Sequence, residues 1–186
     1  GTRYKANTMG WMFVPLTEYH GGGAEATIEP LDQHREHYEQ RLADLLGAGV
    51  QACWRGPRLF DTEATKTVVK RWVDFYKRHR AILDSDLVPL RRADGRDFDG
   101  WLHVNPRLRE CALAVLYNPL PQAIERSVAL PLRYAGVDDR VLVRQGGVPE
   151  VDAEPATEHR VDRDRVLRVS VRIPARGWLV LIASEP

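Results

Sequence analysis

The sequence predicts an α/β segment followed by an all-β domain, and two observations support this fold class. A continuous apolar run followed by an amphipathic helical pattern occurs twice before residue 86. After that residue the helical spacing ends, and short apolar runs separated by turn residues take its place. We therefore expect two βα units in residues 1–86 and an antiparallel β-sandwich in residues 87–186.

The α/β segment is predicted element by element. Residues 9–16 are apolar throughout, which is typical of a strand buried on both faces of a parallel sheet. Residues 31–46 carry apolar side chains at helical spacing, and residues 50–54 form a second short apolar strand. Asp61 or Thr62 is the expected N-cap of the next helix, which has apolar positions between 68 and 83. Two such units in tandem predict a parallel sheet.

The second half of the sequence predicts strands and tight turns. Residues 87–90 and 97–104 flank a turn at 93–96 and are expected to form a hairpin. Further strands are expected at residues 111–117, 124–130, 141–144, 166–173 and 178–182. Residues 149–163 are acidic and poor in apolar side chains, so we expect a surface loop there.

Composition limits the classes of partner. The 186 residues are 44% hydrophobic, which is ample for a buried core. The 27 basic and 26 acidic residues nearly cancel, so neither nucleic acid nor a membrane surface is an expected partner. No run is long and apolar enough to span a membrane, and the N-terminus does not have the pattern of a signal peptide. Cys53 and Cys111 are expected to be buried reduced thiols, which favours a cytoplasmic location unless a secretion signal lies upstream.

One part of the sequence resembles a known family. Residues 46–50 (LGAGV), the loop 55–59 (RGPRL) and the helix 70–83 (KRWVDFYKRHRAIL) resemble the C-terminal part of α-galactosidase-like glycoside hydrolases. In that family the last helix of a TIM-type (β/α)8 barrel carries a similar Tyr-Lys-x-x-Arg stretch and leads into a β-sandwich. The resemblance implies that residues 1–86 are the last two βα units of such a barrel.

The same resemblance implies a chemistry. The family hydrolyses glycosidic bonds, and its nucleophile and acid carboxylates lie on middle barrel strands, which here would be upstream of Gly1. The chain also begins without Met and enters a strand within nine residues, so we expect preceding sequence. The catalytic residues are therefore unknown, and this chain alone is expected to be inactive. The implied partners are a carbohydrate substrate and the missing N-terminal barrel segment.

The segment after the first strand is the first candidate for substrate binding. Barrel enzymes place their sites at the C-terminal ends of the strands. There, Tyr19 could stack on a sugar face, while Glu18 and His20 could donate or accept hydrogen bonds with hydroxyl groups. Three glycines at residues 21–23 would let the backbone approach a ligand. The alternative is a flexible connection with solvated polar side chains.

Trp54 and Arg55 end the second strand and form the second candidate. An aromatic ring beside a guanidinium can stack on a saccharide and hydrogen-bond to it. In the alternative, Trp54 packs under the β-sandwich while Arg55 forms a salt bridge with Asp61. The sequence favours neither interpretation over the other.

No metal or cofactor is expected. His34 and His37 have the spacing of a shared metal site, but no third ligand is nearby, so a structural role or plain solvent exposure is favoured. Asp94, Asp97 and Asp99 surround a glycine turn without the closing Glu of a calcium loop, which favours turn chemistry.

A second hypothesis is a non-catalytic carbohydrate-binding or interaction module, in which the β-sandwich binds glycan. It predicts that Trp101, Tyr117, Tyr134 and Trp178 gather on a solvent-facing surface, whereas the enzyme hypothesis predicts that they are buried. An intact small enzyme is disfavoured, because no Ser-His-Asp order, metal set or dinucleotide loop occurs in its expected context.

Overall fold

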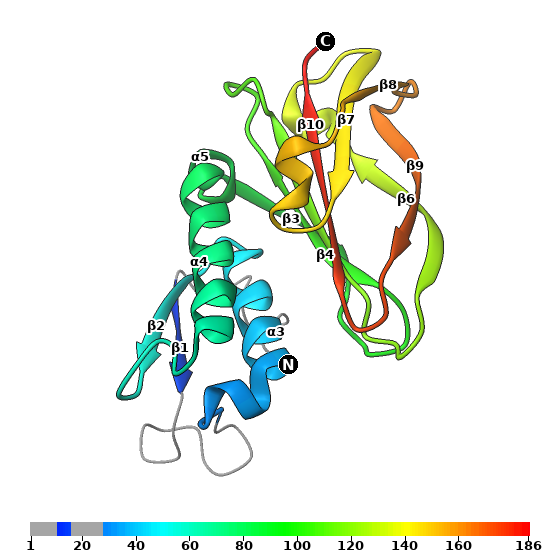
Figure 1. Cartoon of the computed structure of the whole chain (residues 1–186). Coiled ribbons are helices and arrows are strands. Elements are labelled where there is room, and N and C mark those ends of the chain that lie inside the picture. The colour runs from blue at the N-terminus through cyan, green and yellow to red at the C-terminus, as the bar shows by residue number, and fades with distance from the viewer. Residues whose placement is uncertain (1–10, 16–27) are drawn as a thin grey trace. The chain divides into compact units, whose positions relative to one another are not determined.

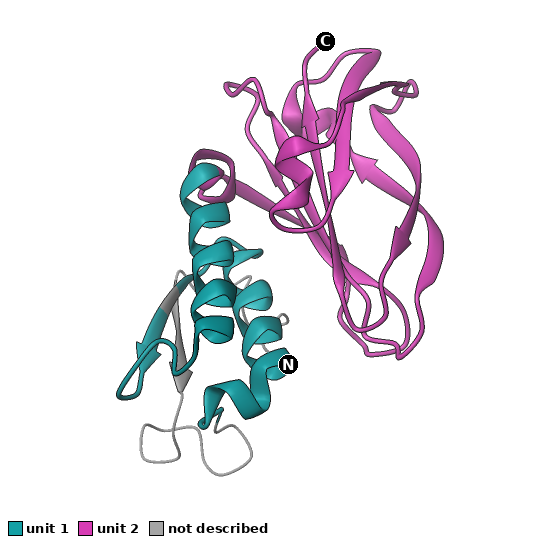
Figure 2. Cartoon of the chain, viewed as in Figure 1, with its two compact units in different colours: residues 1–78 teal, residues 79–186 magenta. Residues whose placement is uncertain are grey.

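The chain contains two compact units. The computed structural model describes residues 28–186 and the backbone of residues 11–15 (Figure 1). Unit 1 is Gly1–Arg78 and unit 2 is His79–Pro186 (Figure 2). The division falls after Arg78, whereas the sequence placed a domain boundary after residue 86. The assignment of residues 1–86 and 87–186 as domains remains a prediction.

Unit 1 has the strand and helix order that the sequence predicts. Its elements are β1 (Trp11–Pro15), the 3-10 turn η2 (Leu31–His34), α3 (Arg35–Leu46), β2 (Gln51–Arg55) and α4 (Glu63–Arg78). The two strands are parallel and in register, with Phe13 opposite Cys53. Both helices lie on the same side of the strand pair (Figure 1).

Each helix buries one apolar face. In α3 the buried face includes Tyr38 and Leu42, and in α4 it includes Val68, Trp72 and Phe75. The rings of Trp72 and Phe75 pack edge to face with centroids 5.8 Å apart. Such a pair adds about 0.5–1.5 kcal/mol to the stabilisation that burial provides. The predicted helical periodicity therefore identifies the buried face of α4, whereas α3 is buried all round from Leu42 to Leu46, Asp44 included.

A polar contact also joins the two helices. The Glu39 carboxylate on α3 accepts a hydrogen bond from Trp72 Nε1 at 3.1 Å and pairs with the Arg71 guanidinium. α4 begins directly after Thr62, whose hydroxyl oxygen accepts a hydrogen bond from the Thr65 backbone amide at 3.2 Å. Thr62 is thus the N-cap, as the sequence predicted.

The single helix predicted through residue 83 is interrupted at His79. α4 ends at Arg78, His79 adopts φ −104° and ψ 17°, and the short α5 (Arg80–Leu83) follows in unit 2. His79 is buried, and its Nε2 lies 2.6 Å from Asp152 Oδ1. The backbone leaves the α4 geometry at this residue, which the apolar periodicity alone does not reveal.

Unit 2 is built from two antiparallel sheets. The larger sheet has the order β3 (Asp86–Arg91), β4 (Asp99–Val104), β5 (Ala112–Tyr117), β10 (Trp178–Ser184), β7 (Arg140–Gly146) and β8 (Thr157–Arg160). The smaller sheet pairs β6 (Ile124–Pro131) with β9 (Val166–Ile173). Every neighbouring pair is antiparallel, which confirms the predicted antiparallel organisation.

The two sheets of unit 2 share one apolar core. In β9 the buried side chains Leu167, Val169, Val171 and Ile173 alternate with exposed polar ones. They join a cluster that includes Leu102, Leu116, Val141 and Leu181 of the larger sheet. β4 and β5 are buried at every position. The sequence of β5 is accordingly a continuous apolar run, whereas β4 also contains the buried polar residues Asp99 and His103.

One strand was missed in the sequence. Residues 149–163 were predicted to be a surface loop, but they contain the 3-10 turn η4 (Glu150–Ala153) and the edge strand β8. β8 pairs with β7, with His159 opposite Val141. The prediction was wrong there because this short edge strand buries none of its side chains and so has no apolar alternation.

Candidate functional site

The loop that follows β2 is held in place by a chain of hydrogen bonds. Trp54 Nε1 donates to the Tyr38 hydroxyl oxygen at 2.9 Å, and that hydroxyl donates to the carbonyl oxygen of Leu59 at 2.6 Å. Desolvation by burial raises the pKa of Tyr38 to about 12, so the phenol keeps its proton at neutral pH. Tyr38 of α3 thus links the end of β2 to the middle of the loop.

An arginine gives the loop a second anchor. Arg58 Nε donates to Glu29 Oε1 and Arg58 Nη2 donates to Glu29 Oε2, each at 3.1 Å. Two parallel bonds of this kind fix the plane of the guanidinium as well as its position. The Arg58 side chain is largely exposed, so the pair orients the loop more than it stabilises the fold.

A polar cluster closes the loop at the start of α4. The Thr65 hydroxyl donates to Asp61 Oδ1 at 3.0 Å, and the Asp32 amide donates to Asp61 Oδ2 at 3.2 Å. Desolvation pushes the pKa of Asp61 upward, but these hydrogen bonds outweigh it and lower the pKa below its usual value. Asp61 is therefore an ionised carboxylate whose oxygens are both engaged by neighbouring groups.

Trp54 and Arg55 leave opposite faces of β2, because successive side chains of a strand alternate. Trp54 is half-buried and bonded to Tyr38 of α3, so it faces the helices. Gln51, Cys53 and Arg55 lie on the other face and are exposed. The structure therefore does not place the two predicted site residues side by side on one face. Their role in binding a substrate remains a prediction.

The two cysteines differ. Both are free, and Cys111 is buried as predicted, whereas Cys53 is exposed. Burial of Cys53 was inferred from the apolar run around it, and that inference was wrong. Cys53 lies on the face of β2 that is turned away from α3, where Gln51 and Arg55 are exposed as well.

Two apolar side chains project from the anchored loop. Leu59 is 43% exposed and Phe60 is 41% exposed. Lys66 Nζ lies 5.6 Å from the centroid of the Phe60 ring, within the range of a cation–π contact. Sequence reasoning missed this pair, although two adjacent apolar residues within a polar loop were a usable signal.

The predicted residues Glu18, Tyr19 and His20 lie outside the described part of the chain. Their proposed contacts with a sugar remain predictions.

The candidate metal ligands have other contacts or lie in solvent. His34 Nδ1 lies 2.9 Å from the carbonyl oxygen of Ile28. Asp94 accepts hydrogen bonds from Arg91 on both carboxylate oxygens, at 3.0 and 2.9 Å, and Asp97 accepts one from Arg126 at 3.0 Å. Among the residues that the structure describes, no group of three or more His, Cys, Asp and Glu side chains could hold a metal ion.

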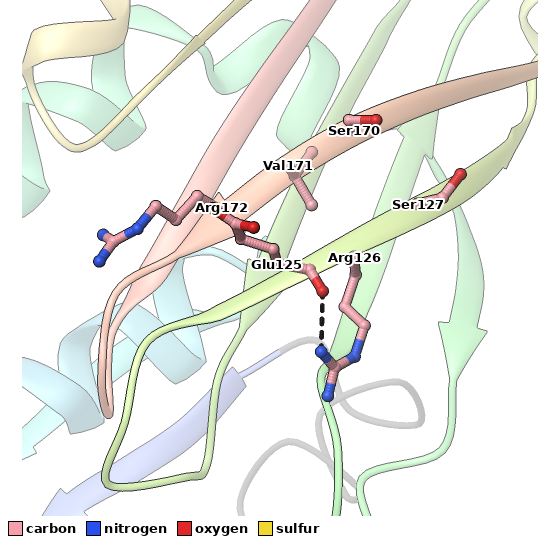
Figure 3. Close-up of a pocket in the computed structure, with 6 residues that line it drawn as sticks. All are labelled: Glu125, Arg126, Ser127, Ser170, Val171 and Arg172. Atoms are coloured by element: carbon pink, nitrogen blue, oxygen red, sulfur yellow. Dashed lines mark hydrogen bonds between the residues drawn. The ribbon is translucent and has the colours of Figure 1, made fainter.

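A groove of about 510 Å³ lies along β6 and β9 in unit 2 (Figure 3). Its lining residues are Glu125, Arg126, Ser127, Ser170, Val171 and Arg172. Arg126 is already engaged, since its Nη1 donates to the carbonyl oxygen of Glu125 at 2.8 Å and its Nε donates to Asp97. No aromatic side chain lines the groove, so it lacks a surface on which a sugar ring would stack.

Comparison with known proteins gives a likeness of fold. No family model and no curated protein matches the sequence. An α-amylase from Geobacillus thermoleovorans, complexed with acarbose, aligns with a TM-score of 0.55 and 11% identity over 94% of this chain. A GH27 β-L-arabinopyranosidase from Geobacillus stearothermophilus aligns with a TM-score of 0.53 and 12% identity over 98% of this chain. An Anoxybacillus α-amylase aligns with a TM-score of 0.54 and 10% identity over 87% of this chain.

These solved structures are glycoside hydrolases, and the resemblance stated from the sequence is confirmed at the level of the fold. This chain spans only 40% of the arabinopyranosidase, 38% of the first amylase and 35% of the second. At such low identity the likeness concerns the fold and not the chemistry. As a separate finding, none of the helices in residues 28–186 has the length and apolar character needed to cross a membrane.

Proposed function

We propose that this chain is the C-terminal portion of an α-galactosidase-like glycoside hydrolase. In this proposal residues 1–86 are the last two βα units of a TIM-type barrel, and residues 87–186 form its C-terminal β-sandwich. The catalytic carboxylates belong to upstream barrel strands, so the chain alone is inactive. The solved structures that share the fold support the class of enzyme.

The uncovered face of β2 is the observation that carries the proposal. Parallel strands are normally covered on both faces, because the helices of βα units and further strands enclose them. Here α3 and α4 lie on one side of the β1–β2 pair, while Gln51, Cys53 and Arg55 are exposed on the other (Figure 1). In a closed barrel that second face is the interior, which is packed with side chains.

The proposal gives each predicted site residue a role. Arg55 is the last residue of β2 and lies on the face that would be interior, so it reaches the rim where barrel enzymes bind substrate. Glu18, Tyr19 and His20 follow β1 in the sequence, and in this proposal they contact the substrate beside Arg55. Trp54 acts indirectly, because it donates a hydrogen bond to Tyr38, and Tyr38 in turn donates one to the loop.

The aromatic residues of unit 2 favour this proposal over a carbohydrate-binding module. Trp101 and Tyr117 are buried, at 6% and 2% exposure, and Trp178 is half-buried. Of the four aromatic residues in question only Tyr134 is exposed. A stacking surface made of all four is therefore ruled out for the sheets of unit 2.

Hydrolysis of nitrophenyl α- and β-glycosides tests the proposal. We expect no hydrolysis by the chain alone and measurable hydrolysis when it is extended upstream through a complete barrel. In the extended protein, Arg55→Ala should lower kcat/KM by about tenfold or more, because a charged hydrogen bond to the substrate is lost. Arg163→Ala, an exposed arginine in unit 2, is the matched control. Absence of hydrolysis by the extended protein, with glycan binding retained, would favour the binding module instead.

A further inference from the structure

The loop between β2 and α4 combines several hydrogen-bonded anchors with exposed apolar side chains. Its Leu59 carbonyl is held by Tyr38, Arg58 is held by Glu29, and Asp61 is held by Thr65. Leu59 and Phe60 nevertheless expose 43% and 41% of their surface. Exposed apolar side chains on a mobile loop can fold back onto the protein, but an anchored loop keeps them in solvent.

We propose that Phe60, flanked by Leu59, is a stacking platform for one ring of a neutral saccharide. This inference rests on the proposed function in one respect, because it places the platform at the rim of the substrate site. Phe60 lies beside Lys66, which belongs to the first turn of α4, so Phe60 is on the helix side of the rim. Arg55 lies on the face of β2 that is turned away from the helices. Phe60 would therefore contact a sugar unit further from the reacting bond than the one that Arg55 contacts.

The chemistry around the ring suits a hydroxyl-rich ligand. The axial and equatorial C–H groups of a pyranose form an apolar face that packs on an aromatic ring. Around the Phe60 ring, Lys66 offers an ammonium donor 5.6 Å from the centroid, and Arg58 lies two residues away on the same loop. The net charge of +1 for the whole chain gives no long-range attraction for an ionic ligand.

The exposed apolar area of Leu59 and Phe60 is too small for a stable protein partner to be the favoured ligand. Specific protein interfaces bury roughly 1,200–2,000 Å² in total and centre on a cluster of several apolar residues. Leu59 and Phe60 are two adjacent side chains, and the residues next to them, Arg58 and Asp61, are charged. A single sugar ring matches this small apolar area with a polar border.

A titration followed by NMR tests the platform on the 186-residue chain itself. The probes are raffinose and maltotetraose at millimolar concentrations, and the readout is the movement of the Leu59, Phe60 and Lys66 amide signals. We expect saturable shifts for at least one probe. Phe60→Ala should weaken binding by about three- to tenfold, the loss expected for one aromatic contact, and Phe60→Trp should retain it. Tyr134→Ala removes an exposed aromatic from unit 2 and serves as the matched control.

The outcomes separate this inference from the proposed function. Absence of shifts at the loop, equal binding by Phe60→Ala, or an equal loss in Tyr134→Ala would overturn the platform. Hydrolysis of oligosaccharides by the extended protein is measured independently. If hydrolysis occurs but the platform test fails, the proposed function stands without the platform. If Phe60-dependent binding occurs without hydrolysis, the platform stands and the glycosidase proposal fails.

Discussion

Asn118 shows how a single residue organises one end of unit 2. Only 1% of its surface is exposed, and its side chain forms hydrogen bonds with the backbone of two separate segments. Nδ2 donates to the carbonyl oxygens of Gln122 at 2.8 Å and Pro174 at 3.0 Å, and Oδ1 accepts from the Leu120 amide at 2.9 Å. One amide therefore joins the loop after β5 to the turn between β9 and β10.

Replacing Asn118 with Ala should destabilise the chain by about 2–4 kcal/mol, because buried backbone groups lose their partners. The free energy of unfolding in urea is the measurement. Asn118→Asp should lose at least as much, since it places a buried carboxylate oxygen against the carbonyl oxygens of Gln122 and Pro174 in place of the amide donor. The control Gln122→Ala alters an exposed side chain and should change stability by less than about 0.5 kcal/mol. A loss in the control as large as that in Asn118→Ala would contradict this account.

At the scale of elements, the sequence predicts best where packing dictates residue type. α4 was recognisable because Val68, Trp72 and Phe75 repeat at helical spacing, and β9 because Leu167 to Ile173 alternate. The break at His79 and the edge strand β8 were not recognisable in this way, because each involves a contact with a residue distant in sequence. The same limit applies to the candidate site. Trp54 and Arg55 were predicted together as site residues from their position at the end of a strand, but the alternation of side chains that separates them was not applied.

The pairing of β4 with β5 makes a prediction about Gly100. A Cβ at this position would lie 2.5 Å from the carbonyl oxygen of Val115 and 3.0 Å from a side-chain carbon of Leu116. Gly100→Ala therefore requires the β4 and β5 backbones to move apart, and we expect a loss of about 2–3 kcal/mol in urea unfolding.

Gly95 is the matched comparison for Gly100. It has φ +73° and open space around the Cβ position, so Gly95→Ala pays only for the left-handed backbone conformation. We expect a loss of about 1–2 kcal/mol, which is smaller than that of Gly100→Ala. The reverse order of the two variants would show that the β4–β5 spacing is more adaptable than the structure indicates.

At the scale of the whole molecule, the two units differ in how completely their sheets are covered. Unit 2 has two antiparallel sheets that enclose a core of buried apolar side chains from both. Unit 1 has a pair of parallel strands with one exposed face on β2. Two-stranded sheets are marginal alone, and parallel sheets are normally covered on both sides. The independent folding of the two units should therefore differ.

A chain of residues 79–186 should fold by itself, because its core is drawn from its own strands. We expect a β-type circular dichroism spectrum, a single cooperative urea transition, and dispersed amide signals in NMR. Residues 1–78 alone should instead give a broad transition and exposed apolar surface detectable by dye binding, because the β2 face carrying Cys53 lacks a cover. Adding the upstream barrel strands should sharpen that transition and protect Cys53 from thiol reagents. Cooperative folding of 1–78 with Cys53 still reactive would mean that β1 and β2 need no further strands, and would remove the main structural support for a barrel.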